Sequence, residues 1–237
     1  MSRDKNEIQP RATEQEVSAF LRQVATTPTR RTTGERGRLI FAMDATASRE
    51  PTWDRACQIQ AAMFSETRQL GGLEVQLAFY RGFRELKATP WYADGDRLLR
   101  QMTRVSCAGG LTQIGRLLRH TIAESKRGRV NALVFVGDCM EESRDELADL
   151  AGQLGLLGLP GFFFQEGRDP VAEQSFREMA RLSGGAWCPF DSNSPQLLRD
   201  LLSAVAVFAA GGRQALEDFG RRRGGAVRQL TDQMQRG

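Results

Sequence analysis

The sequence contains a single histidine and few cysteines, and these shortages argue against several kinds of site. His120 is the only histidine in 237 residues. The cysteines show no Cys-x-x-Cys spacing, which argues against a zinc knuckle or a redox pair. We expect them to be free and buried, as small apolar side chains in a reducing compartment. The four cysteines are Cys57, Cys107, Cys139 and Cys188.

Long apolar runs and nucleotide-binding signatures are also missing. No segment approaches the roughly 18 apolar residues of a membrane-spanning helix, and the longest apolar stretch, residues 201–210, is too short. Residues 1–10 have mixed charge and no apolar core segment, so we expect no secretory signal and a cytoplasmic location. No Gly-x-x-x-x-Gly-Lys sequence occurs, which excludes a P-loop enzyme.

Positive charge is concentrated near the two ends of the sequence. Residues 1–37 carry seven Lys/Arg and five Asp/Glu, and residues 213–237 carry six and three. Because the whole chain has a net charge of +4, the middle of the chain has a small negative net charge. A nucleic-acid-binding domain would need a face rich in lysine and arginine. We therefore expect no nucleic-acid partner for the central domain.

The most informative stretch, residues 38–48, is an apolar run that ends in oxygen-bearing side chains. Residues 39–43 are all apolar, as expected for a strand of a parallel sheet that helices cover on both faces. Asp44, Thr46 and Ser48 follow at alternate positions. Ligands bind at the carboxyl ends of the strands in open α/β sheets. One carboxylate and two hydroxyls are oxygen donors of the kind that Mg²⁺ prefers.

Two further segments supply donors of the same kind. A Gly109-Gly110 pair precedes Thr112, and we expect these glycines to let the backbone approach a bound cation closely. Residues 133–138 form a second apolar run that ends in Asp138. If both apolar runs are parallel strands of one sheet, their aspartates meet at the same edge.

These three segments together resemble the metal-ion-dependent adhesion site (MIDAS) of von Willebrand factor type A (vWA) domains, the fold that integrin I domains share. The resemblance rests on the Asp-x-Thr-x-Ser sequence at 44–48, the threonine at 112 and the Gly-Asp pair at 137–138. It covers roughly residues 38–210. Thr46 departs from the family, which usually has serine there, but the two hydroxyls are chemically equivalent.

The resemblance implies a protein-interaction module and not an enzyme. Asp44 would bind the cation directly and Asp138 through water, so the cation would stay electrophilic and accept a carboxylate from a partner protein. Thr112 would switch between direct and water-mediated coordination. Many bacterial members resemble accessory subunits of AAA+ ATPases, which makes such an ATPase a candidate partner. The predicted ligands of Mg²⁺, or of Mn²⁺ or Ca²⁺, are Asp44, Thr46, Ser48, Thr112 and Asp138.

Two other interpretations stay open. One is a Mg²⁺-dependent hydrolase or phosphotransferase, but the haloacid dehalogenase type needs a second aspartate where Thr46 stands. We expect His120 on the polar face of its helix, away from Ser48, so a Ser/His/Asp set is not indicated. The other interpretation is a scaffold with a purely structural metal. Three glutamates near the predicted rim are candidate bases, selectivity residues or solvated side chains: Glu50, Glu141 and Glu142.

Cys139 directly follows Asp138 and is a further candidate ligand. A soft thiolate is a poor match to neighbouring hydroxyls and carboxylates in a magnesium site. The sequence alone therefore favours a buried, structural role for this cysteine.

The order of apolar runs and amphipathic segments predicts a doubly wound, Rossmann-like α/β fold. We expect a mainly parallel six-stranded sheet with one antiparallel edge strand and helices on both faces. The predicted strands cover 39–43, 73–80, 83–88, 130–137, 162–165 and 186–190. The predicted helices cover 51–70, 94–102, 112–125, 143–157, 170–182 and 196–210. Asp94 is a candidate N-cap, Ser143 and Glu146 form a candidate capping box, Asp169-Pro170 opens the helix over 170–182 and Gly184 ends it.

Extensions flank this predicted domain of residues 38–210. Residues 1–37 contain an amphipathic helix over 13–25, with a Thr13–Glu16 capping box, and then a linker. The apolar face of this helix packs either on its own domain or on a partner. Residues 211–237 form a basic tail, which is either an arm for an acidic surface or a helix that folds back on the domain.

Overall fold

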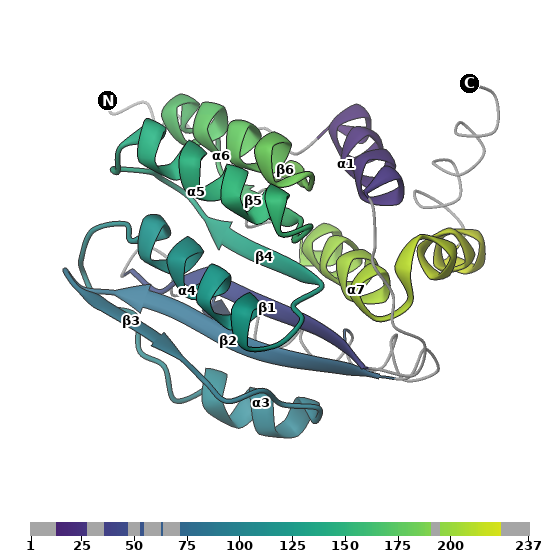
Figure 1. The fold of residues 1–237 in the computed structure, drawn as a ribbon, viewed down its shortest axis with the longest axis horizontal. Helices are drawn as coiled ribbons and strands as arrows, with labels where there is room; N and C mark the ends of the chain where they lie inside the picture. The colour runs from purple at the N-terminus through teal and green to yellow at the C-terminus, as the bar shows by residue number, and fades with distance from the viewer. Residues whose placement is uncertain are drawn as a thin grey trace, which may run out of the picture.

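The structure is a computed structural model, and it describes residues 13–27, 36–46, 53–54, 63, 72–190 and 195–223. Its centre is a six-stranded sheet with the strand order β3-β2-β1-β4-β5-β6 (Figure 1). Neighbouring strands pair in parallel, except that β3 runs antiparallel to β2 at one edge. This arrangement confirms the predicted fold class. The strands are β1 Gly37–Asp44, β2 Leu73–Arg81, β3 Glu85–Ala88, β4 Ala132–Gly137, β5 Gly161–Glu166 and β6 Ala186–Phe190.

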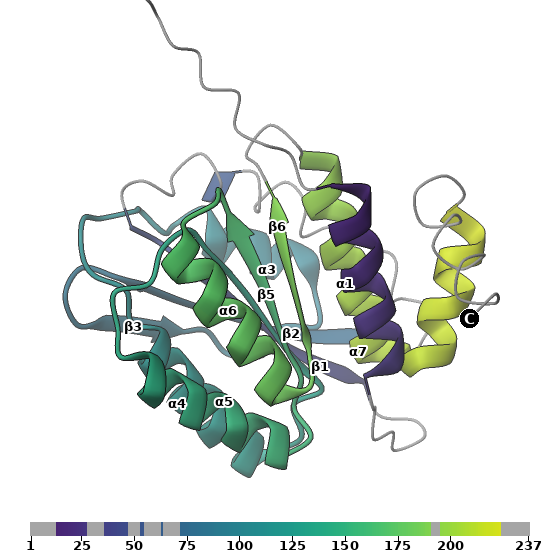
Figure 2. The same ribbon diagram turned by 90° about the horizontal axis from the view of Figure 1, so that it is seen from above.

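Helices cover both faces of the sheet. Figure 2 shows α4, α5 and α6 on one side and α1 and α7 on the other. The helices are α1 Glu14–Thr26, α3 Gly95–Met102, α4 Ile114–Arg127, α5 Arg144–Leu156, α6 Pro170–Ser183 and α7 Pro195–Arg223. Most of the helix predicted over 51–70 lies outside the described residues. None of the described helices combines the length and the apolar character needed to cross a membrane.

Residues 39–43 of the central strand β1 are all apolar because both faces of the strand are buried. Leu39, Phe41 and Met43 belong to the core that α1, α3 and α7 cover. Ile40 and Ala42 belong to the opposite core, beneath α4, α5 and α6. A strand buried on both faces needs apolar side chains at every position and not an alternating pattern.

Local capping signals fix several helix ends where the sequence predicts them. The Asp94 side chain accepts from the Asp96 amide at the start of α3, and the Asp169 side chain accepts from the Ala172 amide at the start of α6. Gly184 ends α6 with a φ of 73°, a left-handed conformation that favours glycine. The α5 prediction is wrong in one detail. Ser143 stands at the N-cap, but in the described structure its side chain makes no capping hydrogen bond.

Helix α1 packs on its own domain and not on a separate partner. The Phe20 ring lies 5.1 Å from the Phe164 ring and 6.1 Å from the Phe162 ring, both on β5. At the end of the helix, the Thr27 hydroxyl donates to the Gly184 carbonyl at 3.0 Å. The predicted capping box at Thr13 and Glu16 is present. The apolar face of α1 is therefore part of the main core.

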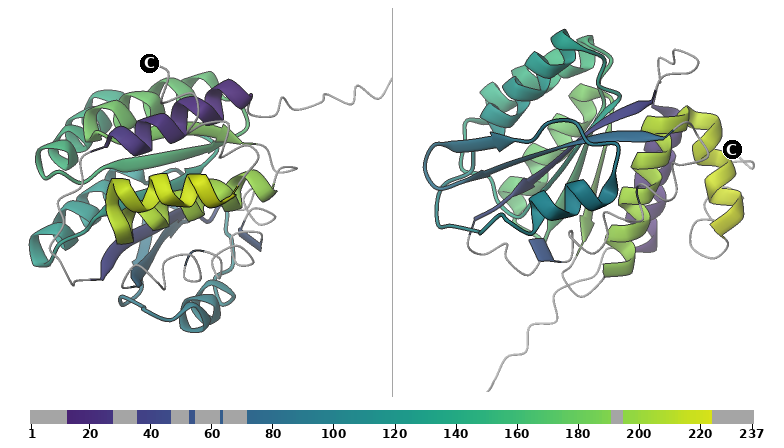
Figure 3. Two further views of the ribbon diagram at one scale, coloured as in Figure 1. Left: turned by 90° about the vertical axis from the view of Figure 1, so that its right-hand side faces the viewer. Right: turned by 90° about the horizontal axis from the view of Figure 1, so that it is seen from below.

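Helix α7 continues past the position where the sequence predicts its end. Gly212 has non-helical angles, φ 71° and ψ −167°, and divides the helix into two segments. Figure 3 shows the final yellow segment lying beside the earlier green one. Ala215, Leu216 and Phe219 of this segment are buried in the core, which favours a folded-back helix as far as Arg223. Residues 224–237 lie outside the described part, and the division of the chain at 37 and 210 stays a prediction.

Candidate metal centre

Two aspartates meet at the carboxyl edge of the sheet. Asp44 ends β1 and is fully buried, whereas Asp138 directly follows β4 and is partly buried. The two strands are parallel neighbours, with Met43 opposite Val136. One ligand atom each from Asp44, Asp138 and Cys139 can be chosen so that all three lie within 4.8 Å of one another. The structure thus brings together two of the five predicted ligands and adds a sulfur.

The turn after β1 holds the Asp44 carboxylate in place. The Thr46 amide donates to Asp44 Oδ1 at 2.7 Å, which folds the chain back over the aspartate. Ala45 fixes the same turn from both sides, because its amide donates to the Tyr80 carbonyl and its carbonyl accepts from the Ala108 amide. Thr46 is partly buried beside Asp44. The predicted ligand Ser48 and the rim residue Glu50 lie outside the described residues.

Thr112 lies against the loop that begins with Asp138. Its hydroxyl accepts from the Glu141 amide at 3.0 Å, and its amide donates to the Glu141 carboxylate at 3.1 Å. These two hydrogen bonds hold the buried Thr112 side chain against the β4–α5 loop, which contains Glu141. The structure therefore places the predicted switch residue, in the loop before α4, in direct contact with the loop that carries Asp138 and Cys139.

Glu142 caps helix α4 from a distant part of the chain. Its carboxylate accepts from the Ile114 and Gly115 amides at the first turn, where a negative charge also meets the positive end of the helix dipole. The residue at the N-cap, Gln113, makes no capping hydrogen bond with its side chain. A helix without a capping side chain at its own N-cap needs an acceptor from elsewhere in the chain, and Glu142 is that acceptor here. Glu141 and Glu142 thus hold the loop together, which favours neither as a catalytic base.

The two glycines before Thr112 differ in how tightly they are packed. A side chain at Gly110 would meet the Gly82 carbonyl oxygen at 2.1 Å, so Gly110 packs against the β2–β3 turn. The Leu111 amide and the Gln113 side-chain amide both donate to that carbonyl. Gly109 has open space around it. Gly110 is therefore needed for a close backbone contact, and the expected approach of this loop to a cation stays a prediction.

Negative charge accumulates around the buried end of β1. Burial, with the Asp44 carboxylate beside it, raises the pKa of the Tyr80 phenol well above its ordinary value. Burial, followed by the Asp138 charge, raises the pKa of the Cys139 thiol to about 12. Each of these groups resists carrying a negative charge because it is buried and because carboxylates already occupy the site.

Solved structures with the same architecture identify the fold. A von Willebrand factor type A structure from Catenulispora acidiphila matches with a TM-score of 0.57 and 15% identity, covering 73% of this chain and 43% of that one. The SpRpn10 VWA domain matches with a TM-score of 0.53 and 14% identity, covering 71% of this chain and 94% of that domain. The chain has the von Willebrand factor type A fold.

A third solved structure has a similar fold. An aerotolerance-related membrane protein from Bacteroides fragilis NCTC 9343 matches with a TM-score of 0.53 and 14% identity, covering 70% of this chain and 98% of that one. No protein-family model matches the sequence, and no curated protein matches it. With identities this low, the similarity establishes the fold and leaves the site to be argued from its own residues.

The residues at this edge of the vWA sheet fit a divalent cation. Asp44 and Asp138 supply carboxylate oxygens, the donors that hard cations prefer. A cation would neutralise charge that the buried Asp44 carboxylate otherwise brings into the protein interior. The Thr46 and Thr112 hydroxyls stand on the two loops that flank these carboxylates. The donor set and its burial therefore agree with a bound metal ion.

His120 is partly buried on the polar face of α4, and that face packs against the sheet at this position. Its Nε2 lies 2.8 Å from Oε1 of the buried Gln76 on β2, and burial lowers the pKa of its ring. Glu124, one turn further along α4, accepts from the Trp91 indole at 3.0 Å. The histidine thus belongs to a polar cluster between α4 and the sheet. The helical periodicity of the sequence does not predict this contact, because Gln76 lies on a strand that is distant in the sequence.

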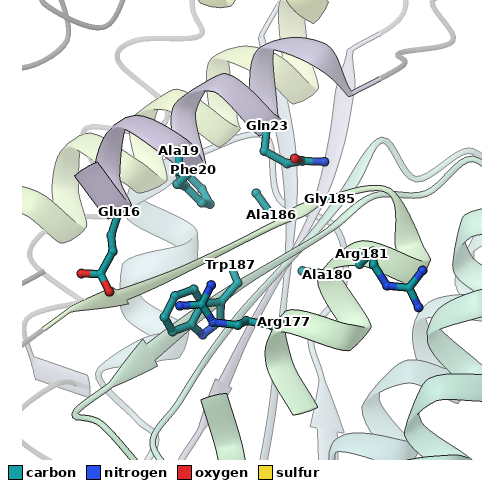
Figure 4. Close-up of a pocket in the computed structure, with 10 residues that line it drawn as sticks. All are labelled: Glu16, Ala19, Phe20, Gln23, Arg177, Ala180, Arg181, Gly185, Ala186 and Trp187. Atoms are coloured by element: carbon teal, nitrogen blue, oxygen red, sulfur yellow. The ribbon is translucent and has the colours of Figure 1, made fainter. Parts of the chain in front are cut away.

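A groove separate from the metal centre lies between α1, α6 and β6. Its volume is about 260 Å³, and its lining includes Phe20 of α1 and Trp187 of β6. Figure 4 shows the Arg177 guanidinium over the Trp187 ring, with its central carbon 3.8 Å from the ring centroid. None of the residues lining this groove belongs to the loops that carry Asp44, Thr112 or Asp138.

Proposed function

We propose that this protein is a metal-dependent protein-interaction module that recognises an acidic residue of a partner protein. Mg²⁺ is the proposed cation, and the proposed partner contact is a glutamate or aspartate carboxylate. One observation carries the proposal: the Asp44 and Asp138 ligand atoms converge with Cys139 within 4.8 Å at the carboxyl edge of a vWA sheet. The proposed ligands are Asp44, Thr46, Ser48, Thr112 and Asp138.

The bound cation supplies a positive charge with an exchangeable position that a partner's carboxylate can take. The chain's own residues prepare the site for this contact. The Thr46 amide orients the Asp44 carboxylate, and Glu141 holds Thr112 on the opposite loop. Because Asp44 is buried and held by the backbone, little reorganisation is needed when a cation binds.

Calorimetric titration with Mg²⁺ and Mn²⁺ tests the cation. Asp44→Asn and Asp138→Asn keep the side-chain size but remove one negative charge, and each should weaken cation affinity at least about tenfold. Asp149→Asn, at an exposed position on α5, is the matched control and should leave the affinity unchanged. If the wild-type protein binds neither cation at millimolar concentration, the proposal is wrong.

Partner capture from a cell lysate tests the interaction. The experiment compares Mg²⁺ with EDTA and wild-type protein with Asp44→Asn. We expect a partner that is retained only with Mg²⁺ and intact Asp44, and an AAA+ ATPase is one candidate. A cation that raises the melting temperature while every captured partner stays bound in EDTA would instead support a structural metal.

A further inference from the structure

The Cys139 sulfur lies among the carboxylates of the metal centre. Its Sγ is one of three atoms that lie within 4.8 Å of one another, and the other two are carboxylate oxygens of Asp44 and Asp138. Cys139 is only partly buried, so its sulfur is not fully packed within the apolar core. Its position beside two carboxylates leaves the sulfur within reach of a cation that they bind.

A second observation points to the same place. Tyr80 is fully buried, and its hydroxyl has no hydrogen-bond partner among the described residues. Tyr80 pairs with Asp44 across β1 and β2, at the edge of the sheet where Asp138 and Cys139 also lie. A buried hydroxyl normally has a hydrogen-bond partner, and a ligand or a cation-bound water can be that partner. A ligand or a cation-bound water at this edge of the sheet would give the Tyr80 hydroxyl such a partner.

We propose that Cys139 is a metal ligand, which makes the centre a mixed carboxylate–thiolate site for thiophilic divalent cations such as Zn²⁺. This inference rests on the metal centre of the proposed function and changes the cation that it prefers. Two carboxylates and one sulfur leave one position open, as in zinc sites with three protein ligands and one exchangeable ligand. The thiol releases its proton to solvent when the sulfur binds the cation.

The chemical basis of the preference is the softness of sulfur. A thiolate gains little from Mg²⁺, which binds oxygen ligands, but it binds Zn²⁺, Co²⁺ and Cd²⁺ strongly. Cys139→Ser should therefore lower the affinity for Zn²⁺ at least about tenfold and leave the affinity for Mg²⁺ almost unchanged. Asp44→Asn should weaken both cations, because both use its carboxylate.

Absorption spectroscopy with Co²⁺ and Cd²⁺ as probes tests the sulfur ligand directly. A sulfur-to-metal charge-transfer band in the ultraviolet should appear when the full-length reduced protein is titrated with either cation. The band should be lost in Cys139→Ser and kept in Cys107→Ser, which alters another partly buried cysteine in the loop before α4. Circular dichroism of each variant checks that the fold is intact.

An alkylation experiment needs no variant. Zn²⁺ should slow the reaction of Cys139 with iodoacetamide and leave the reaction of Cys107 unchanged, as measured by peptide mass spectrometry. Protection of Cys139 supports the inference even if Cys139→Ser does not fold. Equal alkylation of Cys139 with and without saturating Zn²⁺ overturns it.

The outcomes separate this inference from the proposed function. Co²⁺ binding without a thiolate band, or a band that persists in Cys139→Ser, overturns the sulfur ligand and leaves the Mg²⁺ proposal standing. A thiolate band together with partner binding that ignores metal supports the inference and contradicts the proposed function. Failure of Co²⁺, Cd²⁺ and Mg²⁺ to bind at millimolar concentration overturns both.

Discussion

Arg168, in the turn after β5, makes a two-point ion pair with Glu16 on α1. The Nη1–Oε1 distance is 2.7 Å and the Nη2–Oε2 distance is 2.9 Å. This pair, together with the Thr13 amide, lowers the pKa of the Glu16 carboxyl to about 2. The stabilisation is complete above the usual value of 4.5 and is lost as the pH falls toward 2.

Replacing this glutamate should therefore have a pH-dependent effect on stability. We expect Glu16→Gln to lower the free energy of unfolding by about 1–2 kcal/mol at neutral pH, as for a partly exposed charge-assisted pair. The difference from wild type should shrink between about pH 4.5 and 2. Urea denaturation at a series of pH values measures it. Glu178→Gln, which breaks the more exposed pair with Arg144, should have almost no effect at any pH.

The docking of α1 depends on one aromatic side chain. Phe20 is 1% exposed and packs on the β5 rings, so Phe20→Ala should lower the free energy of unfolding by about 3–5 kcal/mol. Gln23→Ala, at an exposed position on the same helix, should change it by less than about 0.5 kcal/mol. Equal effects of the two substitutions in chemical denaturation would show that α1 does not contribute to the domain core.

The two loop glycines provide a matched pair of substitutions. Gly110→Ala should lower the free energy of unfolding by about 1–3 kcal/mol, because the new methyl group overlaps the Gly82 backbone. It should also weaken cation binding, since the displaced loop carries Thr112. Gly109→Ala meets no atom within 4 Å and should leave both quantities unchanged. Thermal unfolding and calorimetric titration measure the two effects, and identical results for both variants would contradict the close backbone contact.

The distant cap of α4 should be measurable as well. Glu142→Ala removes the acceptor for the Ile114 and Gly115 amides and should cost about 1–2 kcal/mol of stability. Glu142→Gln keeps one acceptor oxygen without the charge, so its effect should be intermediate. Urea denaturation of both variants provides the comparison. A Gln variant as unstable as the Ala variant would show that the charge alone matters.

The sheet could be predicted from the sequence because each strand carries its own signal. Residues 186–190 are a short apolar run between turn residues, and residues 83–88 follow residues 73–80 across an Arg81-Gly82 turn, which predicts an antiparallel hairpin. The structure confirms both strands. Helix ends with a local side-chain cap, such as Asp94 and Asp169, were identified for the same reason. The meeting of Asp44 and Asp138 followed from the parallel order of the strands that carry them.

Features that depend on residues far apart in the sequence could not be predicted in this way. Glu142 caps a helix that begins 28 residues earlier, and His120 contacts Gln76, 44 residues away. The expected capping box at Ser143 did not form, and Glu146 pairs instead with Arg119 of α4. The position of the Cys139 sulfur depends on the turn after β4, whose conformation no periodic pattern specifies.

The position of α1 also determines when the domain can be completed during synthesis. Glu16 precedes Arg168 by 152 residues, and the aromatic partners of Phe20 lie in β5. At about 5–20 residues per second, a ribosome needs roughly 8–30 s after it has added Glu16 to reach Arg168. During that interval the apolar face of α1 has none of its β5 partners. Docking of the first helix is therefore a late step, and shielding by a chaperone would be most useful before β5 emerges.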